Sequence, residues 1–262
     1  MNILFDNQMV RSMVFYPRMA RPHYTETPTG PISDGTITAD GRIVLGYRLY
    51  RHSATAPLIV YFHGNAETAP EHNGVAALYA KIGLSLLVID FRGYGWSTGQ
   101  ANISTLLTDM TGIYAAMPDL MQRHDIPMAP LFLMGRSLGT GCAIHMAHDY
   151  PDGFRGLIVE SGFTELLKLS IVPDAFTKLA EPINSLQKMH DVQLPLLVIH
   201  GERDTLIPVE HGQALYDASP ATIKRIARIA RAGHNDLLVF GISTYFDAIE
   251  QFVTDVLAKP TG

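Results

Sequence analysis

The chain has very little cysteine, since Cys142 is the only one in 262 residues. A disulfide framework within the chain is therefore excluded, and this composition is typical of a reducing compartment. The sequence also lacks a run of about eighteen apolar residues, the length that a membrane-spanning helix needs. Asp6 and Arg11 interrupt the N-terminal stretch, which therefore lacks the apolar centre of a secretory signal peptide. These absences predict a cytoplasmic protein without an integral membrane segment.

An excess of positive charge is missing as well. The net charge is −5, so there is no electrostatic reason to expect nucleic acid as a partner. No glycine-rich stretch has the P-loop or dinucleotide-binding pattern. His145 and His148 are three residues apart in a predicted helix, but no H-E-x-x-H motif accompanies them. We therefore expect neither a cofactor nor a metal ion, and the sequence makes no prediction about oligomeric state.

Short apolar runs alternate with helical patterns along most of the chain. The runs are nearly continuous, as in strands that are buried on both faces of a parallel sheet, and they cover 57–62, 84–90, 130–134, 156–160 and 195–200. The helical candidates are 72–83, 104–117, 137–150, 209–218 and 244–257. A hairpin with its turn at Asp40-Gly41 is predicted to precede them. This order predicts one α/β domain over 1–262, with a mostly parallel central sheet flanked by helices.

A serine between two glycines, in the pattern G-x-S-x-G, occurs twice in the sequence. Ser137, in GRSLG, follows an apolar run and opens a helical pattern rich in small residues. That context is typical of a nucleophile on a sharp strand-to-helix turn, where glycines allow close packing of the two backbones. Ser97, in GWSTG, lies in a loop that no helix follows at once, and we interpret it as a turn residue. The sequence therefore predicts Ser137 as the nucleophile.

A serine hydroxyl needs a base, and the base needs an acid that orients it. His234 lies in a loop just before the last predicted helix, and we rank it first as the base. Asp204 follows the carboxyl end of the 195–200 run, where sheets of this kind build their sites. Glu160 ends the preceding run, so we rank Asp204 first and keep Glu160 as the alternative acid. The backbone N–H groups of Leu138 and Asn65 are the candidates for an oxyanion hole.

Five motifs in this order resemble the α/β-hydrolase superfamily. They are HGNAET (63–68), DFRGYGWSTG (90–99), GRSLGTG (135–141), HGERDTLIP (200–208) and AGHND (232–236). The pattern is most similar to the Bem46-like branch, which is grouped with serine-aminopeptidase-like hydrolases, and it extends from about residue 35 to the C-terminus. The resemblance implies the same Ser137, Asp204 and His234 as nucleophile, acid and base. It also implies a last strand within 221–232, although three isoleucines spaced three apart there favour a helix.

Residues 161–193 occupy the place where such enzymes insert a cap, which here is short, with room for about two short helices. Four apolar side chains in this stretch are candidates for an acyl pocket, or equally for packing between cap and domain: Phe163, Leu166, Leu167 and Phe176. We therefore predict a cofactor-free serine hydrolase that cleaves an ester, thioester or amide of a small-molecule or acyl substrate. Carboxylesterase or thioesterase activity ranks first. A peptidase and a non-catalytic binding protein are the alternatives.

Overall fold

The computed structural model describes residues 6, 8–23, 30–127, 129–166 and 183–259. These residues form two compact units, Met1–Leu131 and Phe132–Gly262. Within the described ranges, no helix combines the length and the apolar character that crossing a bilayer requires.

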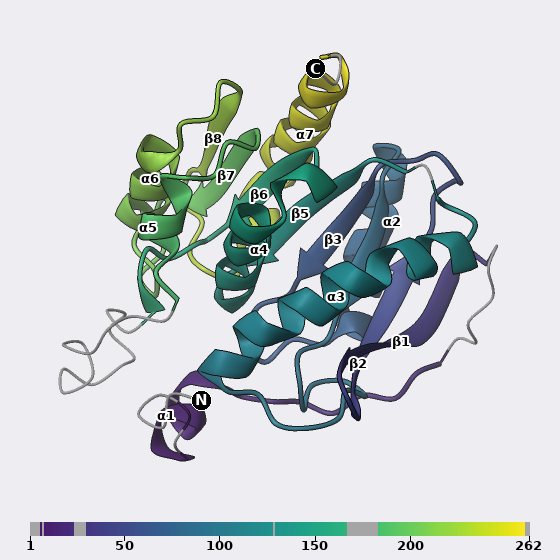
Figure 1. Ribbon diagram of the computed structural model, residues 1–262. Helices are drawn as coiled ribbons and strands as arrows, with labels where there is room; N and C mark the ends of the chain where they lie inside the picture. Colours follow the sequence, from purple (N-terminus) through teal and green to yellow (C-terminus); the bar gives the residue numbers. More distant parts are fainter. Residues whose placement is uncertain (1–5, 7, 24–29, 128, 167–182, 260–262) are drawn as a thin grey trace. The chain divides into compact units, whose positions relative to one another are not determined.

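Among its described residues, the first unit contains four strands in the order β1-β2-β4-β3 (Figure 1). Its elements are α1 (Gln8–Val14), β1 (Ile32–Asp40), β2 (Ile43–Tyr50), β3 (Leu58–Phe62), the 3₁₀ helix η1 (Ala69–His72), α2 (Asn73–Lys81), β4 (Ser85–Ile89) and α3 (Ile103–Arg123). The first two strands form the predicted hairpin, and Gly41 in its turn has a φ of 53°. β2 runs antiparallel to β4, whereas β3 and β4 are parallel. α3 packs against β1, and its N-cap is Asn102, whose side chain accepts a hydrogen bond from the amide of Thr105.

The described part of the second unit contains four parallel strands in the order β5-β6-β7-β8. Its elements are β5 (Leu131–Arg136), α4 (Leu138–Asp149), the 3₁₀ helix η2 (Pro151–Gly153), β6 (Gly156–Glu160), α5 (Ser185–Met189), β7 (Leu196–Gly201), α6 (Val209–Ala218), β8 (Lys224–Ile229) and α7 (Leu237–Leu257). α4 and α6 lie on one face of these strands and α7 on the other (Figure 1). The carboxyl ends of β5, β6 and β7 therefore meet at one edge of the unit.

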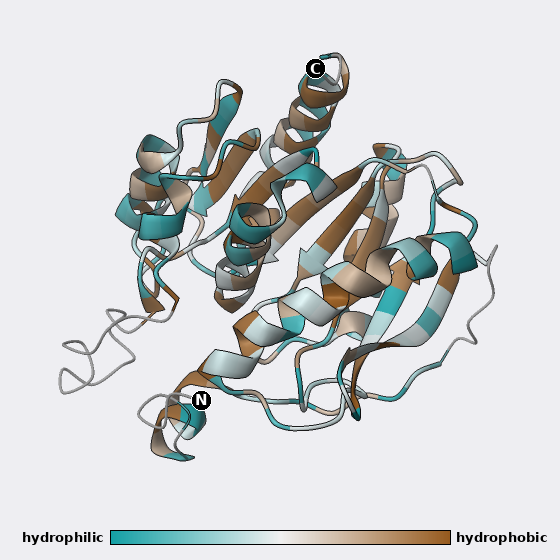
Figure 2. Ribbon diagram, viewed as in Figure 1, coloured by the Kyte–Doolittle hydropathy of each residue, from teal (hydrophilic) through white to brown (hydrophobic). Residues whose placement is uncertain are grey.

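The core strands are largely apolar, and most of β5 and β7 is brown in Figure 2. Every residue of β3, β4, β6 and β7 is buried. This burial explains why the runs in the sequence are continuous instead of alternating, because helices cover both faces of a parallel sheet. All five apolar runs predicted as strands are strands, and all five helical candidates contain a helix.

Two helix boundaries differ from the sequence prediction by more than two residues. α3 continues past Pro118 to Arg123, because the buried side chains of Leu120 and Met121 extend its apolar face beyond the proline. α7 begins at Leu237 instead of residue 244, and Gly241 leaves the helical conformation within it (φ −153°, ψ 43°). Glycine tolerates such a break, so the segment that follows His234 consists of two helical stretches that meet at a kink at Gly241.

The isoleucine spacing favours a helix where β8 lies, whereas the family resemblance predicts a strand there. It pairs in parallel with β7 and stands at the end of the strand order. Ile229 is its only buried residue, so neither alternation nor a continuous apolar run develops. An edge strand with one neighbour buries less of its surface, and its sequence pattern is correspondingly weak.

Candidate active site

Ser137 lies at the turn between β5 and α4, in a backbone conformation that few side-chain-bearing residues adopt. Its φ is 50° and its ψ is −117°. Conformations of this kind cost about 1–3 kcal/mol and persist where the surroundings impose them. The Ser137 amide donates to the Glu160 carbonyl (3.0 Å), and the Ser137 carbonyl accepts from the Thr140 hydroxyl (2.6 Å). These bonds hold the turn and leave the side-chain oxygen of Ser137 to face another partner.

The glycine before this turn is required by close packing. A Cβ built on Gly135 would lie 2.4 Å from the Gly139 carbonyl oxygen and 2.6 Å from the Thr140 Cα. Any side chain at this position would therefore push the strand away from the helix that follows it. Gly135 allows β5 and α4 to approach closely, as the strand–turn–helix arrangement in the sequence predicts.

The structure brings together the three residues that the sequence selected. His234 Nε2 lies 2.9 Å from Ser137 Oγ, and His234 Nδ1 lies 2.7 Å from Asp204 Oδ2. A carboxylate only accepts hydrogen bonds, so the imidazole donates through Nδ1 and can accept the serine proton at Nε2. Both His234 and Ser137 remain slightly exposed, whereas the Asp204 side chain is fully buried. All three belong to the second unit.

Asp204 is held by the loop that follows β7. Its Oδ1 accepts from the amides of Leu206 (2.9 Å) and Ile207 (2.8 Å). His200 Nε2 donates to the Ile207 carbonyl (2.8 Å) and lies 3.5 Å from Asp204 Oδ2. Burial acts to raise the pKa of Asp204, but the hydrogen bonds from His200, His234 and Ile207 outweigh burial and lower this pKa well below its usual range. The carboxylate therefore stays charged beside His234.

Glu160, the alternative acid, has other partners. Its carboxylate accepts from the Tyr245 hydroxyl (2.8 Å) and lies 3.3 Å from Arg136 Nε. Arg136 in turn donates from Nη2 to the carbonyl of His234 (3.0 Å) and to Asn235 Oδ1 (2.8 Å). Sequence reasoning missed the roles of Arg136, Tyr245 and His200. Only the position of Arg136 next to the nucleophile offered a signal.

The two candidate oxyanion donors have different surroundings. The buried Leu138 is the first residue of α4, so its amide lies at the positive end of that helix. Asn65 belongs to the first unit, where its side chain accepts from the Tyr16 amide (3.0 Å) and donates to the Val14 carbonyl (2.6 Å). This side chain anchors the segment after α1. The assignment of the Asn65 backbone N–H to an oxyanion hole stays a prediction.

Two of the four acyl-pocket candidates lie within the described residues. Phe163 is fully buried and Leu166 is 2% exposed. A Cβ on Gly141 of α4 would lie 3.3 Å from Phe163 Cζ, so this ring packs against the helix that follows Ser137. Leu167 and Phe176 lie outside the described residues. The acyl-pocket assignment stays a prediction.

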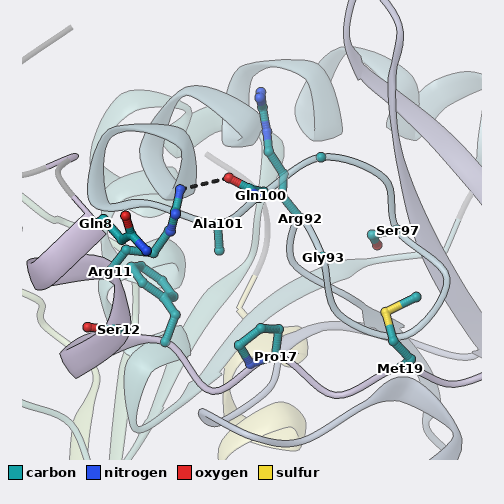
Figure 3. Close-up of a pocket in the computed structure, with 12 residues that line it drawn as sticks. Gln8, Arg11, Ser12, Pro17, Met19, Arg92, Gly93, Ser97, Gln100 and Ala101 are labelled. Carbon is teal, nitrogen blue, oxygen red and sulfur yellow. Dashed lines mark hydrogen bonds between the residues drawn. The ribbon is translucent and has the colours of Figure 1, made fainter.

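Ser97, the second G-x-S-x-G serine, lines a cavity of about 460 Å³ in the first unit (Figure 3). Its hydroxyl donates to the Asp90 carbonyl (2.9 Å) and accepts from the Gly46 amide (2.8 Å). Both partners are backbone groups that cannot accept a proton as a catalytic base does. On another wall of this cavity, Arg11 of α1 donates to Gln100 Oε1 (2.7 Å), as Figure 3 shows. The partners of Ser97 are those of a structural turn residue.

The chain also matches a known protein family. The family model described as "Serine aminopeptidase, S33" matches residues 53–186 and 165–238. This chain belongs to that family of α/β-hydrolases. The predicted superfamily and fold class are thereby confirmed, and the chain is assigned to a family of hydrolases.

Relatives and solved structures extend the comparison. The chain is 27% identical over 260 residues to an uncharacterized protein of Mycobacterium tuberculosis, covering 97% of this chain and 90% of that protein. It is 28% identical over 200 residues to mouse alpha/beta hydrolase domain-containing protein 17C, covering 76% of this chain and 60% of the mouse protein. The structure of esterase Pf2001 from Pyrococcus furiosus has a TM-score of 0.71 at 19% identity, covering 92% of this chain and 99% of the esterase. Est1E from Butyrivibrio proteoclasticus, solved with ferulic acid, has a TM-score of 0.69 at 20% identity, covering 86% of this chain and 100% of Est1E.

Proposed function

We propose that the chain is a serine hydrolase that forms an acyl-enzyme on Ser137 and acts on carboxylic esters or thioesters. The observation that carries the proposal is the continuous contact from Ser137 Oγ to His234 Nε2 (2.9 Å) and from His234 Nδ1 to Asp204 Oδ2 (2.7 Å). The strained turn at Ser137 and membership of a hydrolase family support it.

In the first half-reaction, Ser137 Oγ attacks the substrate carbonyl carbon while its proton passes to His234 Nε2. Asp204 stabilises the imidazolium through Nδ1–H and keeps the ring in the productive tautomer. The backbone N–H groups of Leu138 and Asn65 are the proposed donors to the tetrahedral oxyanion. When the intermediate collapses, the bond to the leaving alcohol or thiol breaks, and His234 gives that group its proton.

The second half-reaction repeats these roles with water. His234 takes a proton from a water molecule, whose oxygen attacks the acyl-enzyme carbonyl. Collapse of the second tetrahedral intermediate breaks the bond to Ser137 Oγ, which recovers its proton from His234. The carboxylic acid leaves and the free enzyme returns. We assign Phe163, Leu166, Leu167 and Phe176 to the acyl side of the pocket.

A fluorophosphonate probe tests the nucleophile directly, because it reacts with activated serines. Native and heat-unfolded protein are treated with the probe, and the modified peptide is located by mass spectrometry. We expect modification of Ser137 in the native protein alone. Modification of Ser97 would reverse the choice between the two serines. The absence of modification, together with no turnover of p-nitrophenyl acetate, would favour the non-catalytic binding protein.

A matched substrate panel separates the subclasses. Aminoacyl p-nitrophenyl esters, thioesters and p-nitroanilides that carry the same aminoacyl group differ only in the leaving group. We expect kcat/KM to be higher for esters and thioesters than for anilides. A clear preference for aminoacyl anilides would instead assign the aminopeptidase activity that the family description names.

A further inference from the structure

Arg136 connects the turn that carries Ser137 to the loop that carries His234. It is the last residue of β5 and immediately precedes Ser137. Its Nη2 donates to the His234 carbonyl (3.0 Å) and to Asn235 Oδ1 (2.8 Å). One guanidinium group therefore binds the backbone of the proposed base from the strand that ends at the proposed nucleophile.

Glu160 fixes this guanidinium from the neighbouring strand. Arg136 and Glu160 are register partners on β5 and β6, and Arg136 Nε lies 3.3 Å from Glu160 Oε1. The other carboxylate oxygen accepts from the Tyr245 hydroxyl of α7 (2.8 Å). The exposed fractions of the Arg136 and Glu160 side chains are only 14% and 7%, so solvent screens the pair weakly. The backbone carbonyl of Glu160 also holds the Ser137 amide.

His234 is thus held at two points. Asp204 binds the imidazole through Nδ1, which limits rotation of the ring. That bond acts on the ring and not on the His234 backbone, and a shift of about 1 Å at a reacting group can cost about 10²-fold in rate. Arg136 binds the His234 carbonyl and supplies the second point. The two contacts therefore act on His234 from its side chain and from its backbone.

We propose that Arg136, held in place by Glu160 and Tyr245, is a positioning residue that sets the contact between His234 and Ser137. This inference rests on the proposed function, in which His234 acts as the base. It also gives Glu160 a role other than that of the triad acid, because Glu160 acts on His234 through Arg136.

The test replaces Arg136 by methionine, which retains much of the apolar stem and removes the guanidinium. Arg225→Met is the matched control, because Arg225 also forms an ion pair within the second unit, with Asp255. We expect Arg136→Met to lower kcat and the rate constant for fluorophosphonate modification of Ser137 by about 10-fold or more, with KM within about threefold. Arg136→Lys should recover part of the rate, since its ammonium can still donate to the His234 carbonyl. Arg225→Met should match the wild type.

A second readout does not depend on turnover. In ¹⁵N-histidine NMR spectra, the His234 Nδ1 proton that bonds to Asp204 should give a protected downfield signal. We expect Arg136→Met to exchange this proton faster and Arg225→Met to leave it unchanged. A wild-type modification rate together with an unchanged signal in Arg136→Met would overturn the positioning role. A changed signal in a protein whose serine never reacts would support positioning and reject the proposed hydrolase.

Thermal unfolding shows whether Arg136→Met is folded. Should it fail to fold, Tyr245→Phe removes a single hydroxyl from Glu160 and keeps the ring. It should lower the modification rate of Ser137 by about twofold to fivefold. A rate equal to that of the wild type in this milder variant would count against the network.

Discussion

At the scale of single residues, Ser137 combines an unfavourable backbone conformation with a defined side-chain partner. The amide and carbonyl of Ser137 are bound to Glu160 and Thr140, so the left-handed φ of 50° is imposed by the turn. Strain of this kind is found where a site must present one group in one direction. Here the group is the hydroxyl, and the direction is toward His234.

Ser137→Ala removes that hydroxyl and changes little else in the turn. Because the acyl-enzyme forms on this hydroxyl in the proposed mechanism, kcat for an activated ester should fall on the order of 10⁴-fold or more. Steady-state hydrolysis of p-nitrophenyl acetate measures this effect, with Ser97→Ala as the control. A loss of only a few-fold in Ser137→Ala would remove Ser137 from the role of nucleophile.

Asp204 follows one parallel strand and Glu160 ends another, so both are candidates for the acid that orients His234. Substituting each of them separately shows which one has that role. Asp204→Asn should lower kcat by about 10³-fold to 10⁴-fold, because the amide no longer favours the productive tautomer of His234. Glu160→Gln keeps an oxygen for Arg136 or Tyr245 and should cost about 10-fold at most. Parallel kinetics on one ester measure both. Equal losses would contradict the assignment of Asp204 as the acid.

At the scale of elements, the close approach of β5 and α4 makes Gly135 sensitive to substitution. Gly135→Ala places a methyl group 2.4 Å from the Gly139 carbonyl oxygen. We expect it to lower the free energy of unfolding by about 1–3 kcal/mol and to reduce kcat, since the turn must shift. Urea denaturation and ester hydrolysis provide the two readouts.

Gly74 in α2 is a suitable control for this substitution. Nothing lies within 4 Å of a Cβ built at this position. Gly74→Ala should therefore stabilise the protein by up to about 1 kcal/mol, because alanine favours the helix. Equal effects of the two substitutions would show that close packing at Gly135 is not needed.

At the scale of the whole molecule, the lowered pKa of Asp204 links stability to pH. A carboxyl group whose pKa is lower in the folded than in the unfolded protein stabilises the fold above its unfolded pKa of about 3.9. That contribution is lost as pH falls below this value toward the folded pKa. The free energy of unfolding of the wild type should therefore exceed that of Asp204→Asn at pH 6, and the difference should shrink between about pH 4 and pH 2. Urea titrations across this range measure it, and a difference that grows on acidification would contradict the assignment.

The sequence by itself determined the elements of the fold and the proposed triad. Buried parallel strands produce continuous apolar runs, and helices produce their own period, so all five runs and all five helical candidates were recognisable locally. Ser137, Asp204 and His234 could be selected because each follows a strand or precedes a helix in the chain order of the superfamily. β8 required the family resemblance, since a strand with one neighbour and one buried residue has no clear pattern.

Only the tertiary structure decided how these residues meet. Asp204 and Glu160 stand at equivalent strand ends, and the loop geometry alone places Asp204 on the imidazole of His234 and Glu160 on Arg136. Arg136 and Tyr245 share no local pattern, because the contact through Glu160 joins segments far apart in the chain. Local preferences therefore predict which segments are strands and helices. The distances between side chains depend on strand register and on the conformation of the loops after the strands. A local sequence pattern predicts neither.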